Sequence, residues 1–142
     1  MTYNIDEIMS AAPVVPVMVI KKLEHAVPLA RALCKGGLKV LEITLRTDCA
    51  LDAISAIREA CPDAIVGAGT IVTPTDLENA IKAGSMFLVS PGSTPSLIDA
   101  ALEHPDVPLL PGVASPSEAM ALMARGITHK NSSQLKLRAV FR

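Results

Sequence analysis

The chain has 142 residues, of which 50% are hydrophobic, and its formal net charge is −1 at pH 7, which fits one globular domain or part of a larger one. It has no basic block and just two phenylalanines and one tyrosine, so it offers no surface on which nucleic-acid bases could stack. The longest apolar run, Val14 to Ile20, is too short to span a bilayer, and the N-terminus lacks the basic start of a signal peptide. We therefore expect a cytoplasmic protein that binds neither nucleic acid nor membrane.

The apolar pattern predicts a short helix at 5–9, followed by five strands that each precede a helix. The predicted strands are 14–20, 40–44, 65–68, 86–90 and 107–110. The predicted helices end at a glycine or before a proline, and they lie at 27–35, 50–61, 74–83, 95–104 and 116–125. The three cysteines fall within or beside these helices at spacings that fit neither a zinc site nor a disulfide framework, so we expect reduced core thiols.

The second strand carries an unusual polar face. From Leu41 to Thr47 the sequence alternates strictly, with Glu42, Thr44 and Arg46 on one side and leucine and isoleucine on the other. Charged side chains are costly in a buried parallel sheet unless they are paired or functional. A solvated edge strand or mutual neutralisation of Glu42 and Arg46 is the structural alternative. In an extended strand these two residues stand about 13 Å apart, which suits opposite ends of a small substrate.

The spacing of the helix starts indicates a repeated unit. Thr-Pro or Ser-Pro pairs open helices at positions 73, 94 and 115, which are 21 residues apart each time. Five consecutive β-α units imply a parallel sheet with right-handed crossovers. The absence of a G-x-G-x-x-G fingerprint and the polar residues at strand ends favour a β/α (TIM-type) barrel over a doubly wound sheet. The chain has room for the first five to six of eight units.

Five motifs, in this order, lie at or near the predicted strands. They are Val-Val-Pro-Val at 14–17, Leu-Glu-Ile-Thr-Leu-Arg-Thr at 41–47, Val-Gly-Ala-Gly-Thr at 66–70, Ser-Pro-Gly at 90–92 and Leu-Pro-Gly-Val at 110–113. Together they resemble the family of 2-keto-3-deoxy-6-phosphogluconate (KDPG) and 4-hydroxy-2-oxoglutarate (KHG) aldolases. The resemblance runs from Pro13 to Thr128 without large gaps.

This resemblance implies a barrel, usually a homotrimer, that cleaves a phosphorylated 2-keto-3-deoxy sugar acid into pyruvate and glyceraldehyde 3-phosphate. The chemistry is of the class I type, in which a lysine amine forms an iminium with the keto group, so no metal or cofactor is expected. By the resemblance Glu42 is the general acid/base, Arg46 binds the substrate carboxylate, and Thr70 hydrogen-bonds the same end of the substrate. For Thr70 the alternative is that it only caps or turns the chain.

The resemblance ends after Thr128. We therefore interpret 1–128 as the N-terminal part of an aldolase barrel and 129–142 as a divergent polar tail. Counting from Gly126 without gaps puts Asn131 where the Schiff-base lysine belongs. Lys136 has suitable leucine neighbours if about five residues are inserted, which makes it the candidate amine.

Three functions follow from this departure. The first is a truncated KDPG aldolase that is impaired or inactive in this form. The second is a non-catalytic fragment, at most a pyruvate-binding or interaction module, and the third is a related barrel enzyme that acts on another 2-keto acid. A reactive lysine distinguishes the first from the second.

Overall fold

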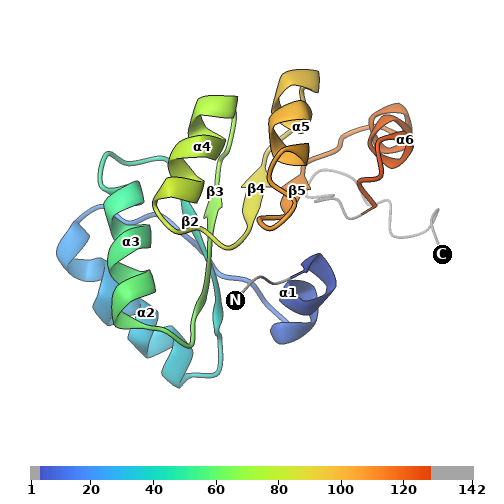
Figure 1. The fold of residues 1–142 in the computed structure, drawn as a ribbon. Coiled ribbons are helices and arrows are strands. Elements are labelled where there is room, and N and C mark those ends of the chain that lie inside the picture. The colour runs from blue at the N-terminus through green and yellow to red at the C-terminus, as the bar shows by residue number, and fades with distance from the viewer. Residues whose placement is uncertain (1–3, 129–142) are drawn as a thin grey trace.

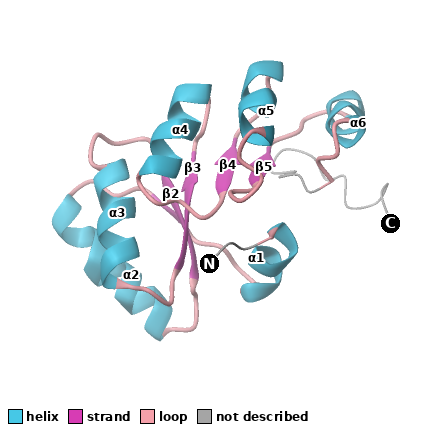
Figure 2. Ribbon diagram, viewed as in Figure 1, coloured by secondary structure: helices cyan, strands magenta, loops and turns pink. Residues whose placement is uncertain are grey.

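The computed structural model describes residues 4–128, which form one parallel sheet with helices between its strands (Figure 1, Figure 2). The sheet order is β1-β2-β3-β4-β5, so each strand pairs with the next in the chain. The strands are β1 (Val17–Met18), β2 (Val40–Thr44), β3 (Ile65–Gly69), β4 (Leu88–Ser90) and β5 (Leu109–Pro111). The helices are α1 (Ile5–Ala11), η1 (Leu23–His25), α2 (Ala26–Lys35), α3 (Ala50–Ala60), α4 (Pro74–Lys82), α5 (Pro95–Leu102) and α6 (Pro116–Ala124).

The strand order confirms the predicted fold class. A doubly wound sheet reverses its strand order at a switch point, whereas these five strands follow one another without reversal. Figure 1 shows α2 to α6 in succession along the sheet, with α1 apart from them. The described residues thus form the first five strands of a TIM-type barrel.

The first strand is shorter than the predicted 14–20. It contains Val17–Met18 alone, which pair with Glu42 and Ile43 of β2. Pro16 has no amide hydrogen to donate, although its carbonyl accepts from the Glu42 amide at 3.1 Å. Beyond the strand, the Ile20 carbonyl accepts from the Thr47 hydroxyl at 2.7 Å, so side chains continue the connection to β2 after the backbone ladder ends. The fourth and fifth strands also begin two residues later than predicted.

The predicted helix starts at 73, 94 and 115 are confirmed. Thr73, Thr94 and Ser115 are N-caps whose side chains accept from the backbone amide three residues later, and each is followed by a proline. Such caps stabilise a helix by roughly 1 kcal/mol each. In α4 the cap is reciprocal, because Asp76 accepts from the Thr73 amide at 2.9 Å.

The 21-residue repeat extends to contacts between helices. Glu78 of α4 pairs with His104, which follows α5, at 2.7 Å. Asp99 of α5 pairs in the same way with Arg125, which follows α6. The two acidic residues are 21 positions apart, and so are the two basic residues. Each of the helices α4 and α5 is therefore joined to the segment that follows the next helix in the chain.

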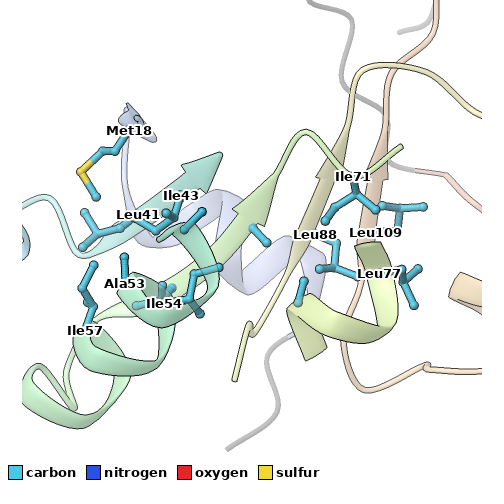
Figure 3. Packing of buried hydrophobic residues seen from close by; sticks show 14 of the residues in the cluster. Met18, Leu41, Ile43, Ala53, Ile54, Ile57, Ile71, Leu77, Leu88 and Leu109 are labelled. Atoms are coloured by element: carbon cyan, nitrogen blue, oxygen red, sulfur yellow. The ribbon is translucent and has the colours of Figure 1, made fainter. Parts of the chain in front are cut away.

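The sheet has a hydrophobic layer on each face. On the outer face Leu41 and Ile43 pack against Ile54 and Ile57 of α3, as Figure 3 shows. A second cluster on the other face joins α1 to the inner side of the sheet, and it contains Ile8, Ala12, Val40, Ile65, Phe87 and Val89. Alternate residues of β2 therefore belong to different layers, and α1 covers the inner face beside Val40.

We predict that the 142-residue chain self-associates. In the described sheet β1 and β5 are the outer strands, and Val14 and Val17 are 58% and 60% exposed beside the first of these edges. Unpaired, apolar edges promote association between chains. Sedimentation velocity over a hundred-fold range of concentration should show growing species, and Val14→Lys should reduce them. A monomer with a reversible, concentration-independent thermal transition would contradict this prediction.

Candidate active site

A pocket of about 250 Å³ lies at the carboxyl ends of the strands. Parallel strands bring these ends to one side of the sheet, which is where β/α barrels hold their active sites. The sequence-predicted residues Glu42, Arg46 and Thr70 all line it. The other lining residues are Val17, Val89, Ser90 and Pro91.

Glu42 is the central residue of β2, and 9% of its surface is exposed. Burial raises the pKa of its carboxyl above the ordinary glutamate value, while the nearby Arg46 guanidinium acts in the opposite direction and is the weaker influence. Within the described part of the chain, no ion pair joins Glu42 to Arg46. The structural alternative of mutual neutralisation therefore does not describe this site, and the carboxylate faces the pocket.

Arg46 does not lie on the strand, contrary to the predicted alternation through Thr47. Strand β2 ends at Thr44, and the Arg46 amide donates to the Thr44 carbonyl at 2.8 Å in a tight turn. The fully extended chain on which the separation of about 13 Å from Glu42 is based is therefore not present, because the chain turns before it reaches Arg46. The turn sends the exposed Arg46 side chain toward the mouth of the pocket.

Thr44, the third member of the predicted polar face, has a structural role. Its side chain is buried, and its hydroxyl donates to the Met18 carbonyl at 3.0 Å. This bond extends the pairing of β1 with β2 beyond their short ladder. Thr44 is therefore unavailable to a ligand, although it shares a strand face with Glu42.

Thr70 follows the last residue of β3 in a left-handed conformation, with φ of 63°. It is the one residue other than glycine with positive φ in the described part of the chain. A β-branched residue is strained there, and such strain is found mainly at functional sites. Its hydroxyl accepts from Arg46 Nε at 3.2 Å, so Thr70 orients the arginine as well as turning the chain.

The walls of the pocket include two valines that the sequence interpretation did not assign to the site. Val17 and Val89 contribute apolar surface from β1 and β4. Val17 is level with Glu42 and Val89 alternates with the outward Leu88, so alternation along the strands could have provided a signal for both. Ser90 lines the pocket too, but its hydroxyl donates to the Gly92 carbonyl at 2.7 Å and so stabilises its own turn.

No lysine among residues 4–128 lines this pocket. Lys136, the candidate amine, lies outside the described residues, as does Asn131. The described residues contain no group of three or more side chains suited to hold a metal ion. None of the described helices is long and apolar enough to cross a membrane.

Comparison with known proteins identifies relatives over most of the chain. The family model of KDPG and KHG aldolase matches residues 5–132. The KHG/KDPG aldolase of Escherichia coli K12 is 52% identical over 122 residues, which are 86% of this chain and 57% of that protein. The 2-dehydro-3-deoxy-phosphogluconate aldolase of Dickeya dadantii has the same identity and coverage.

Solved structures agree with the sequence matches. The KDPG aldolase of Zymomonas mobilis ZM4, crystallised with 3-phosphoglycerate, has a TM-score of 0.82 and 47% identity, over 87% of this chain and 58% of that one. The Legionella pneumophila KDPG aldolase has a TM-score of 0.80 and 46% identity, over 84% of this chain and 57% of that one. In that protein pyruvate was captured at low pH as a covalent carbinolamine.

The chain spans about 57% of the length of these curated relatives. The family model nevertheless covers far more than half of the chain, and the relatives are about half identical to it. From these matches and from the order of its strands, the chain belongs to the KDPG and KHG aldolase family.

Proposed function

We propose that the described residues form the acid/base and carboxylate-binding part of a class I aldolase site, and that the substrate of the complete site is KDPG. One observation carries this proposal: the buried carboxyl of Glu42 and the exposed guanidinium of Arg46 line the same pocket and form no ion pair with each other. Family membership supports the choice of substrate.

Arg46 is proposed to bind the carboxylate of the keto acid. Its Nε is already oriented by Thr70, which leaves the two terminal amino groups of the guanidinium for a ligand. A planar guanidinium binds a carboxylate through two parallel hydrogen bonds, which fixes its orientation as well as its position. Thr70 accordingly acts on the same end of the substrate, in part through Arg46.

Glu42 is proposed to move protons. In class I chemistry a lysine amine condenses with the keto group and releases water, leaving an iminium. The bond between the α-carbon and the hydroxyl-bearing carbon then breaks, its electrons move into the iminium to form an enamine, and the hydroxyl on the released carbon becomes the aldehyde. Glu42 accepts the proton from that hydroxyl, a role favoured by the raised pKa that burial produces.

The amine is not among the described residues that line the pocket. We therefore propose that the 142-residue chain binds pyruvate but does not form an imine efficiently. Asn131 at the expected lysine position supports this, and it favours a pyruvate-binding module as the second candidate function. Assembly as a homotrimer, which the resemblance implies, and a cytoplasmic location, which the composition and the N-terminus predict, both remain predictions.

The first prediction concerns pyruvate binding. Arg46→Ala should weaken it by about ten- to one hundred-fold, because a hydrogen bond to a charged group contributes roughly 1.5–3 kcal/mol. Arg46→Lys is the matched control, since it keeps the charge but loses the two-pronged geometry. Its affinity for pyruvate should lie between those of the wild type and the alanine variant. Isothermal titration calorimetry measures all three. Equal affinity in the wild type and the alanine variant would remove Arg46 from the site.

The second prediction concerns the cost of burying Glu42. Because its folded-state pKa is raised, the folded chain binds more protons than the unfolded chain at pH values between the ordinary and the raised pKa. The contribution of Glu42 to stability should therefore be fully present below the ordinary glutamate pKa and be lost as pH rises through this window. Glu42→Gln should stabilise the fold at neutral pH and lose that advantage in acid. Urea unfolding at several pH values tests this, and Glu7→Gln at an exposed capping site is the comparison.

The third prediction concerns the imine. Incubating the 142-residue chain with pyruvate and borohydride should give no stoichiometric adduct, because imine formation requires an unprotonated amine held in the site. Intact mass measures the adduct, and peptide mapping locates it. Trapping in good yield at Lys136 would show that the tail supplies the amine and would favour an active aldolase.

A further inference from the structure

Gly69, the last residue of β3, lies directly against the side chain of Glu42. A Cβ atom added at Gly69 would stand 1.9 Å from Glu42 Oε1, 2.8 Å from Cδ and 2.9 Å from Cγ. At such distances the Glu42 side chain would have to move to make room for any side chain at Gly69. Gly69 does not have positive φ, so its backbone conformation would permit other residues. The need for glycine here comes from space alone.

The register of β2 and β3 explains the approach. Glu42 is level with Gly67, and Thr44 is level with Gly69. The Glu42 side chain therefore leans along the neighbouring strand, toward the carboxyl ends where the pocket opens. Diagonal neighbours on one face of a sheet are close enough for a long side chain to make this contact.

The position on β3 that is level with Glu42 is covered by another side chain. A Cβ atom at Gly67 would stand 2.4 Å from the ring of Phe87, so that ring already fills the space above Gly67. The two glycines on this face of β3 thus accommodate different side chains. Phe87 occupies the space over the first, and the Glu42 carboxylate occupies the space over the second.

We propose that Gly69 is a positioning residue for Glu42, because its bare α-carbon leaves the space on β3 that the carboxylate occupies. A side chain at this position would push the carboxylate up into the pocket. This inference deepens the proposed function and rests on it for its catalytic meaning, but the contact between the two residues can be tested separately.

The surroundings of Glu42 make the pKa of its carboxyl depend on where the carboxylate lies. Val17 of β1, Val89 of β4 and Phe87 just before β4 line the two cavities that share Glu42. Arg46 is the one other charged residue that lines them in the described part of the chain. Moving the carboxylate off the sheet would take it from apolar neighbours toward water and Arg46, and its pKa should fall toward the ordinary value.

A double-mutant cycle tests the contact. Below the ordinary glutamate pKa, where Glu42 is protonated in both the folded and the unfolded chain, Gly69→Ala should lower the urea midpoint when Glu42 is present. In a Glu42→Ala background the same change should leave the midpoint unchanged or raise it, because alanine restricts the unfolded chain where the backbone permits it. Gly92→Ala is the matched control, since a Cβ there meets nothing within 4 Å and φ is ordinary. An equal loss in both backgrounds would overturn the proposal, and so would unfolding of both variants.

Titration of Glu42 gives a second readout. Carbon-13 NMR of labelled glutamate carboxyls should show one group that titrates above the others and is absent from Glu42→Gln. Gly69→Ala should lower the titration midpoint of this group toward the midpoints of the remaining glutamates, whereas Gly92→Ala should leave it unchanged. A folded Gly69→Ala variant with an unchanged high midpoint would refute the proposal.

Neither experiment uses substrate, so failure of the proposed function leaves a different pattern. In that case pyruvate would not bind the wild-type chain, while the cycle and the titration would still show the coupling of Gly69 to Glu42. Conversely, pyruvate binding without this coupling would reject Gly69 as a positioning residue and leave the proposed function standing.

Discussion

The five-residue parallel ladder between β2 and β3 is the constraint on which both the core and the site depend. It runs from Val40 opposite Ile65 to Thr44 opposite Gly69. Because side chains alternate along a strand, this register directs Leu41 and Ile43 toward the helices and Glu42 toward the inner face. A slip of one residue would place the carboxylate among the helix contacts and Ile43 in the pocket. Packing of the outer layer therefore fixes the position of the candidate acid/base residue.

The site holds two costly features beside one another. Glu42 is a buried carboxyl without an ion pair, and Thr70 is a β-branched residue with positive φ. Each lowers the stability of the fold relative to a simpler alternative, since burial opposes ionisation and left-handed φ strains a threonine. Both face the same pocket and both interact with Arg46. Two destabilising features in one pocket are the pattern expected where stability is given up for function.

Much of this could be predicted from sequence because the signals are local. Caps at 73, 94 and 115 mark the helix starts, and strict alternation placed Glu42 on the face opposite to Leu41 and Ile43. The rest depends on contacts between distant segments. The shortness of β1 reflects Pro16 and its position at the edge of the sheet, and the end of β2 before Arg46 reflects a turn that alternation could not reveal. The approach of Glu42 to Gly69 depends on strand register, which no single strand encodes.

The two ends of the site are coupled through charge. Without a ligand, the Arg46 guanidinium partly offsets the rise that burial causes in the pKa of Glu42. A ligand carboxylate bound to Arg46 would neutralise much of that positive field and exclude water, and both changes favour the protonated form of Glu42. The pKa of Glu42 should consequently rise when a keto acid binds, which makes the carboxylate a stronger proton acceptor once the substrate is in place. Because Thr70 orients the arginine, the strained turn after β3 contributes to this coupling without touching the acid/base group.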